Sequence, residues 1–268
     1  MELSAEARAA GFRLAHYASL ASTNDEAMRL AGEGETDKLW IVAGEQTGGR
    51  GRHGRVWASP PGNLYASLLL IDPGPMQLCA ELGFVAGVAL ARAARQLAGG
   101  DERLALKWPN DLLFAGAKLA GLLLESTRLA DGRLACVIGC GVNCRSFPAG
   151  LAYPASHLSA ALDRDIGPAD IFAPLSAALS QSLDLWASGA GFATIRAQWL
   201  SLCHGLGREL RAKLGNQDIT GVFRTIDAAG RLILETDTSS VAIEAGDIFP
   251  VNIPGAQGAA GQRLKTHG

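Results

Sequence analysis

Residues 118–143 read KLAGLLLESTRLADGRLACVIGCGVN, and this stretch decides the fold. Two apolar runs, 118–126 and 134–139, flank the connection TRLADG, so the pattern predicts an antiparallel strand pair joined by a hairpin loop. Just upstream, Leu104 to Trp108 is a short apolar run that ends at Pro109. The sequence therefore predicts at least three strands within forty residues, with polar side chains at their ends.

Outward from this stretch, the apolar spacing alternates between strand and helix. Short runs predict strands at 12–20, 39–43 and 64–71, the first of them at an edge of the sheet. Helical spacing is found at 82–97, 169–187 and 191–203. Thr23 followed by Glu26 fits a capping box, which predicts a short helix that continues through Ala31.

The pattern changes after residue 205. Four short strand candidates predict a small β-barrel of 45 residues: 209–214, 220–226, 231–236 and 240–245. We therefore expect a catalytic domain over 1–205 and a second domain over 206–250. Residues 251–268 are rich in Gly and Ala and are expected to form a flexible tail.

Composition excludes several classes of protein. The chain has 268 residues with 24 Lys+Arg against 26 Asp+Glu, which argues against disorder and against a whole-protein nucleic-acid binder. Uninterrupted apolar runs are shorter than the ~20 residues that cross a bilayer, and the N-terminus lacks an apolar signal segment. Five cysteines without a CxxC pair do not suggest a disulfide framework, so a cytoplasmic location is expected.

Residues 49–54 read GRGRHG and formally match the dinucleotide fingerprint GxGxxG. That fingerprint must open a helix, whereas here two successive prolines follow in RVWASPPGN. Three arginines on a glycine-rich backbone favour binding of a carboxylate or a phosphate, and the competing interpretation is a solvated basic turn. Cys136, Cys140 and Cys144 recur every four residues, but in this apolar segment buried thiols are favoured over metal ligands.

Lysines are scarce, with only five in the chain, and two of them flank the segment KWPNDLLFAGAK. Lys107 ends a strand beside Asn110 and Asp111, which suits phosphate binding, although Pro-Asn-Asp is also ordinary turn chemistry. Lys118 precedes an apolar strand, where an edge lysine is the competing interpretation. Neither GxSxG nor HExxH is present, so a nucleophilic triad or a zinc protease site has no local support.

Taken together, five segments occur in one order: Ser22-Thr23-Asn24, QTGGRGRHGRVW at 46–57, KWPND at 107–111, KLAG at 118–121 and GCGVN at 139–143. Over residues 15–250 the chain resembles the biotin protein ligase family. His53 stands where the family commonly has an arginine. Only 21 residues precede Ser22, so the resemblance implies the short form without a DNA-binding domain and with no DNA partner.

The resemblance implies an α+β fold, with a mixed β-sheet flanked by helices like that of class II aminoacyl-tRNA synthetases, followed by an SH3-like barrel. It also implies two half-reactions, in which biotin and ATP with Mg²⁺ give biotinyl-5′-AMP, and a lysine of a biotin carboxyl carrier protein then takes the biotinyl group. No membrane partner is expected, and the family includes both monomers and homodimers.

The resemblance also assigns residues. Five are expected to carry the chemistry: Lys118, Arg52, Arg50, Lys107 and Asp111. Biotin contacts are implied for Ser22, Thr23, Asn24, Gln46, Arg50, Gly51, Arg52, Lys118, Gly121, Leu122, Leu123, Gly139 and Gly141. ATP contacts are implied for Arg50, Arg52, Arg55, Trp57, Lys107, Asn110, Lys118 and Asn143.

Chemistry makes these roles reasonable. Neutral polar groups suit the ureido ring of biotin, and glycines and leucines suit its apolar chain. Lys118 would stabilise charge that develops on the reacting phosphate. Asp111 would either enter the Mg²⁺ shell or orient the incoming lysine. Two alternatives stay open: a lipoate or octanoate ligase of the same fold, and a non-catalytic biotin-binding module.

Overall fold

The computed structural model describes residues 1–214, 217–244 and 247–250. They form two compact units: residues 1–204 together with 226–231, and the remaining described residues from 205 on. The sequence assigned 226–231 to the smaller domain, but these residues group with the larger unit. The expected tail, 251–268, lies outside the described residues.

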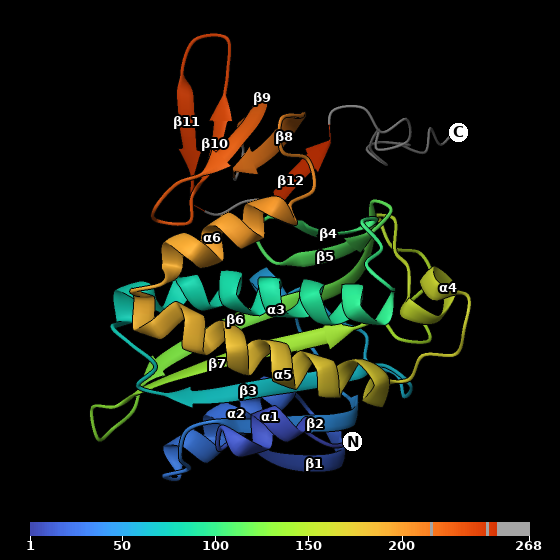
Figure 1. Ribbon diagram of the computed structural model, residues 1–268, viewed down its shortest axis with the longest axis vertical. Helices are drawn as coiled ribbons and strands as arrows, with labels where there is room; N and C mark the ends of the chain where they lie inside the picture. The colour runs from blue at the N-terminus through green and yellow to red at the C-terminus, as the bar shows by residue number, and fades with distance from the viewer. Residues whose placement is uncertain (215–216, 245–246, 251–268) are drawn as a thin grey trace, which may run out of the picture. The chain divides into compact units, whose positions relative to one another are not determined.

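The larger unit is built on a seven-stranded sheet in the order β1-β2-β3-β7-β6-β5-β4 (Figure 1). Its strands are β1 Arg13–Leu20, β2 Leu39–Gln46, β3 Leu64–Ile71, β4 Leu104–Lys107, β5 Asp111–Phe114, β6 Ala117–Arg128 and β7 Leu134–Val142. β1 pairs parallel with β2 and lies at an edge, whereas all other neighbours pair antiparallel. The mixed sheet, the edge strand and the β6–β7 hairpin are therefore confirmed.

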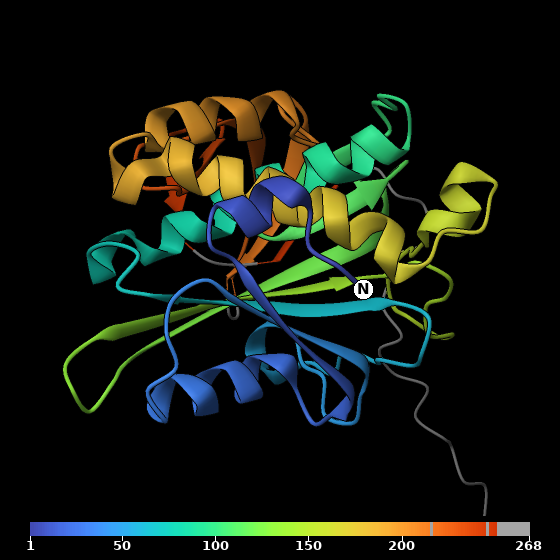
Figure 2. The ribbon, with the colours of Figure 1, turned by 60° about the horizontal axis from the view of Figure 1, so that its bottom comes forward.

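Helices cover both faces of this sheet. The helices are α1 Ala5–Ala9, α2 Thr23–Gly32, α3 Leu82–Leu97, α4 Leu158–Leu162, α5 Pro168–Trp186 and α6 Phe192–Ser201, with 3-10 turns at Arg52–Gly54, Met76–Glu81 and Ala187–Gly189. α3 and α5 lie on one face of the sheet, and α2 lies on the other (Figure 2). The predicted helices at 82–97, 169–187 and 191–203 are confirmed as α3, α5 and α6.

The segment Met76–Leu97 corrects one expectation about apolar length. These 22 residues are helical and contain an 18-residue stretch with a mean hydropathy of 1.3, so by length and composition they could span a bilayer. Polar residues such as Gln77, Glu81 and Arg92 interrupt the segment, so it is not a single uninterrupted apolar run. Of that 18-residue stretch, 61% is buried inside the protein, and α3 packs against α5, α6 and the sheet as a core helix.

The smaller unit contains a five-stranded sheet in the order β11-β10-β9-β8-β12. Its strands are β8 Glu209–Leu214, β9 Gln217–Ile226, β10 Leu232–Glu235, β11 Ser240–Ile243 and β12 Asp247–Pro250. The four predicted strands are confirmed, apart from Ala245, which lies outside the described residues; β12 was not predicted. This sheet is consistent with the small SH3-like domain that the resemblance implies.

The short strand β5 was also missed, although it positions the site. The sequence KWPND indicated only a turn, yet Asp111 is already the first residue of β5 and lies opposite Lys107. On its other side Asp111 lies opposite Gly121, which in turn lies opposite Gly141. Register alone therefore places a lysine, a carboxylate and two glycines in one row across four strands.

Candidate active site

A cluster of buried neutral polar side chains surrounds the N-terminus of α2. Ser22, Thr23 and Asn24 are only 4%, 4% and 5% exposed. The Thr23 amide and hydroxyl donate to Gln46 Oε1 at 2.8 and 3.1 Å. The Ser67 hydroxyl lies 2.7 Å from Thr23 Oγ1 and 2.6 Å from Asn24 Oδ1. Because neighbours fix these groups, the cluster offers preorganised donors and acceptors to a neutral polar ligand.

The start of α2 differs from its sequence prediction. Ser22 is the N-cap, and its Oγ accepts a hydrogen bond from the Asp25 amide at 3.3 Å. The predicted capping box between Thr23 and Glu26 is wrong, because Thr23 turns toward Gln46 and Glu26 pairs with Arg29. This one-residue shift makes the Thr23 hydroxyl available to the polar cluster.

Glycines form a flat floor beside the cluster. Gly139 and Gly141 alternate along β7 and share one face of the sheet with Gly121, which lies opposite Gly141. A Cβ atom on Gly139 would overlap Asn24 Oδ1. A Cβ atom on Gly141 would lie 2.6 Å from Cε2 and Nε1 of the Trp57 indole. Only glycine lets these two side chains lie directly on the sheet.

Leu122 does not belong to this floor. It lies between Gly121 and Leu123 on β6, so its side chain points to the opposite face, and it is only 6% exposed. The prediction that Leu122 lines the ligand surface is therefore wrong. Its backbone still contributes, because the Leu122 amide donates to Asn110 O at 2.9 Å and its carbonyl accepts from Asn110 Nδ2 at 2.5 Å.

Two lysines and one carboxylate lie together where β4, β5 and β6 meet. Asp111 Oδ1 is 2.7 Å from Lys118 Nζ, and Asp111 Oδ2 is 4.0 Å from Lys107 Nζ. The three side chains are 15–27% exposed. Two ammonium groups and one carboxylate leave a local charge of +1, which favours binding of an anion.

Trp57 connects the glycine floor with these lysines. Lys118 Nζ lies 5.4 Å from the centroid of the Trp57 ring, within the range of a cation–π contact. Trp57 Nε1 is buried and makes no hydrogen bond with any residue that the structure describes. The ring is therefore a wall of the site that contacts both the glycine floor and the Lys118 ammonium group.

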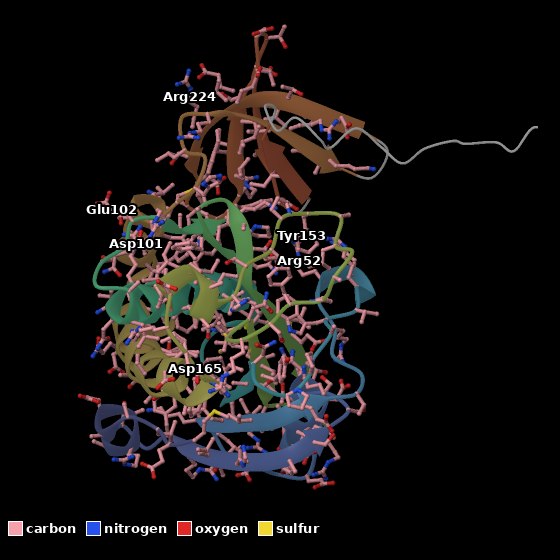
Figure 3. All side chains as sticks on the ribbon, turned by 90° about the vertical axis from the view of Figure 1, so that its right-hand side faces the viewer. Arg52, Asp101, Glu102, Tyr153, Asp165 and Arg224 are labelled. Atoms are coloured by element: carbon pink, nitrogen blue, oxygen red, sulfur yellow. The ribbon has the colours of Figure 1, made fainter. Side chains whose placement is uncertain are left out.

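The glycine–arginine loop is a compact turn held by its own backbone. The Gly51 amide donates to Arg55 O at 2.7 Å, and the Trp57 amide donates to Gly49 O at 2.9 Å. Between them lies the short 3-10 turn Arg52–Gly54, with Arg52 labelled in Figure 3. The next element after this turn is the strand β3, not a helix, which confirms that the loop is not a dinucleotide fingerprint.

Arg50 is tied to carboxylates of its own chain. Its guanidinium bonds both oxygens of Asp25 at 2.6 Å and both oxygens of Glu125 at 3.1 Å. These contacts raise the pKa of Arg50, and the hydrogen bonds to Asp25 contribute most to the rise. Arg50 therefore anchors the loop beside the polar cluster, whereas the sequence assigned it to the substrate carboxylate and the phosphates.

Sequence reasoning missed three polar residues of the site. Glu125 Oε2 accepts a hydrogen bond from Asn24 Nδ2 at 2.6 Å, and Ser59 Oγ accepts one from Gln46 Nε2 at 3.0 Å. Ser67, described above, completes the set. Only Glu125 had a local signal, because it is the first charged residue after the apolar run of β6.

Asn143, which was assigned to the nucleotide, supports the backbone of the site. Its Nδ2 donates to Ser156 O at 3.1 Å, and its own carbonyl accepts from the Leu158 amide at 2.9 Å. The side chain is buried, with 6% exposed. Asn143 thus holds the connection between β7 and α4 against the sheet.

A metal centre has no support in the described part of the chain, where no three His, Cys, Asp or Glu side chains gather. Burial raises the pKa of the Cys140 and Cys144 thiols to about 12, which disfavours the thiolate that a metal needs. Asp111 already pairs with two lysines, so the donor set does not fit a Mg²⁺ ion held by the protein.

Comparison with known proteins agrees with this geometry. Residues 18–143 match the biotin/lipoate A/B protein ligase family, and residues 205–249 match the biotin protein ligase C terminal domain. The biotin–[acetyl-CoA-carboxylase] ligase of Paracoccus denitrificans is 39% identical over 85% of this chain and 96% of that protein. The enzyme of the same name from Mycobacterium tuberculosis is 34% identical over 86% of each chain.

A solved structure extends the similarity to three dimensions. The biotin protein ligase from Aquifex aeolicus in complex with biotin and ATP aligns with a TM-score of 0.75 at 27% identity, over 88% of this chain and 97% of that one. The fold and site define an adenylate-forming acyl ligase. The chain belongs to the biotin protein ligase family, and the resemblance seen in the sequence is confirmed.

Proposed function

We propose that this chain is an ATP-dependent ligase that activates biotin as biotinyl-5′-AMP and transfers it to a lysine of a biotin carboxyl carrier protein. The relatives named biotin–[acetyl-CoA-carboxylase] ligase and the biotin and ATP complex of the Aquifex protein support this reaction. The observation that carries the proposal is the continuous path from a neutral polar cluster, over a glycine floor, to paired lysines.

At one end of the path, the polar cluster holds the ureido ring. Biotin offers one carbonyl acceptor and two N–H donors there, all neutral, and the Thr23, Asn24 and Gln46 groups are neutral as well. Glu125 and Arg50 lie at this end of the path, where Glu125 accepts hydrogen bonds from Asn24 and from Arg50. The valeryl chain then lies along Gly139, Gly141 and the Trp57 ring, where a flat floor excludes water from an apolar chain.

At the other end, Lys118 and Lys107 receive the two reacting anions. An oxygen of the biotin carboxylate attacks the α-phosphorus of ATP; an O–P bond forms, and the bond to pyrophosphate breaks. Lys118 Nζ stabilises the charge that develops on the phosphate oxygens, and Arg52 and Arg55 close over the product. In the second half-reaction the carrier amine attacks the acyl carbon, and AMP leaves with the bonding pair.

Asp111 acts in this proposal as the orienting partner of Lys118, at 2.7 Å, a role that differs from both sequence predictions, the Mg²⁺ shell and the orientation of the incoming carrier lysine. Mg²⁺ is proposed only as the companion ion of ATP, because the described residues offer no group of three His, Cys, Asp or Glu side chains to hold it. Asn110 and Asn143 act on the nucleotide side of the site indirectly. Their side-chain amides donate to the backbone carbonyls of Leu122 and Ser156 and so fix the backbone there.

The acceptor is proposed to be the carrier domain of an acetyl-CoA carboxylase, in keeping with the names of the relatives. We predict that the chain has no DNA partner and no membrane partner. A homodimer is also a prediction. We also propose a cytoplasmic location, which the five free thiols support.

The proposal is tested by transfer to a purified carrier domain. With ATP, Mg²⁺ and biotin, the carrier should gain the mass of one biotinyl group on one lysine, and lipoate should give no product. Transfer of lipoate in place of biotin would reassign the chain to the sister activity within the family. A folded protein that binds biotin but labels no carrier would contradict the proposal.

A further inference from the structure

Tyr153, labelled in Figure 3, lies in the connection between β7 and α4. The residues that follow it in this connection form backbone hydrogen bonds with Lys118. Pairing of β6 with β7 ends at Ala120, so the β6 backbone at Lys118 has no partner from β7. The connection supplies one: the Lys118 amide donates to Pro154 O at 2.8 Å, and the Ser156 amide donates to Lys118 O at 2.9 Å. Tyr153 is therefore fixed in position relative to this lysine.

A second tether holds the same segment from the other side. Asn143 Nδ2 donates to Ser156 O at 3.1 Å, and the Leu158 amide donates to Asn143 O at 2.9 Å. Because the bonds to Lys118 and Asn143 are made at residues 154, 156 and 158, the segment that follows Tyr153 has little freedom to swing away. The backbone next to Tyr153 is thus held by hydrogen bonds, whereas the Tyr153 side chain is not part of the core.

The ring itself contacts the ammonium group. Lys118 Nζ lies 5.5 Å from the centroid of Tyr153 and 5.4 Å from that of Trp57, with Asp111 Oδ1 at 2.7 Å. Tyr153 is 44% exposed, so it contributes little to the core, and the contact with Lys118 is what distinguishes it. Two ring faces and one carboxylate confine a charge that is carried on a flexible four-carbon chain.

Gly121 makes this arrangement possible. A Cβ atom there would lie 3.3 Å from Trp57 Cζ3 and 3.5 Å from Lys118 Nζ. The lysine chain therefore folds closely over the sheet, next to the Trp57 ring. Without Tyr153, the ammonium would be open to solvent on that side and could adopt more rotamers.

We propose that Tyr153 is a positioning residue: together with Trp57 it holds the Lys118 ammonium over the glycine floor, where the biotin carboxylate and the α-phosphate meet. This inference rests on the proposed function. Tyr153 forms no bond with the reactants and acts through Lys118.

The test compares variants in biotin-dependent exchange of labelled pyrophosphate into ATP. Tyr153→Leu keeps apolar bulk without a π face, and kcat should fall about 3- to 30-fold, the scale of one partly desolvated cation–π contact. KM for ATP and for biotin should stay within about 3-fold, because surface substitutions change little else. Tyr153→Phe keeps the ring face and should retain activity.

A double-mutant cycle separates positioning from a general structural effect. In a Lys118→Ala background, Tyr153→Leu should cause no further loss, because the group on which it acts is gone. Phe147→Leu is the matched control: Phe147 is an exposed aromatic of the same connection, but its ring contacts His157, and exchange should be unchanged.

Three results would overturn the inference. Equal losses from Tyr153→Leu with and without Lys118 would show a structural role. A rise in the KM for ATP at unchanged kcat would show that the ring contacts the nucleotide instead. Wild-type protein that exchanges nothing with biotin would overturn the proposed function, and this role with it.

Discussion

The glycine floor makes a specific prediction at Gly141. A methyl group there would lie 2.6 Å from Cε2 and Nε1 of Trp57 and 2.9 Å from Cζ2, well inside normal contact distance. The indole is rigid, so the whole ring must move off the sheet by about 1 Å. Such overpacking costs about 1–3 kcal/mol. It therefore lowers the population of the state in which the Trp57 ring lies against residue 141 about 5- to 150-fold.

Trp57 is bonded to the glycine–arginine loop through its amide, so a ring displaced from Gly141 should loosen that loop. Gly141→Ala should therefore release biotinyl-5′-AMP faster by that factor. The assay is a chase of labelled adenylate from the enzyme with excess unlabelled biotin and ATP. Gly121→Ala is the graded comparison: it lies opposite Gly141, but its Cβ would meet Trp57 only at 3.3 Å. Its effect should therefore be much smaller.

Both variants should melt close to the wild-type protein, because Trp57 belongs to a surface loop rather than to the core. Equal adenylate release from the two alanine variants would refute the reasoning. It would mean that the seating of Trp57 on Gly141 has no part in retaining the intermediate.

Further predictions concern the charges and thiols. Lys118→Ala should slow adenylate formation about 10²- to 10³-fold, measured as pyrophosphate release, and near-normal release would exclude its role. Arg52→Gly should increase leakage of biotinyl-AMP more than it slows synthesis, as seen in a single-turnover chase; unchanged leakage would argue against loop closure. Glu125→Gln should weaken biotin binding about 10-fold by calorimetry, because Asn24 and Arg50 lose a charged acceptor; an unchanged Kd would contradict this. Burial raises the pKa of Cys140 to about 12, so above the unfolded thiol pKa of about 9 only the unfolded state loses the proton, and stability falls as pH rises. Urea midpoints of Cys140→Ala should show less of this alkaline loss than wild type; parallel curves would refute it.

Elements with strong apolar periodicity could be predicted to within a residue or two. Residues 64–71 and 82–97 were predicted with the bounds that the structure has. β5 was missed because its four residues follow turn chemistry, and a strand so short is defined by its partners in the sheet. The capping box at Thr23 failed for a similar reason, since Gln46, 23 residues away, competes for the hydroxyl.

The site shows the same division between local and distant information. Lys107, Asp111 and Lys118 lie within one segment, and the structure brings all three together. The partners of Arg50 lie 25 and 75 residues away, so no local pattern could show that its guanidinium is paired. Tyr153 likewise reaches Lys118 through a connection that carries no motif.

The central claim is that the polar cluster and the paired lysines form one site that joins biotin to ATP. Biotin-dependent exchange of labelled pyrophosphate into ATP with Mg²⁺, with lipoate as the control, tests it most directly. If the two parts form one site, the protein exchanges pyrophosphate with biotin and not with lipoate, and Lys118→Ala loses the exchange. Folded protein that shows no exchange with biotin, or exchange that survives removal of Lys118, would contradict it.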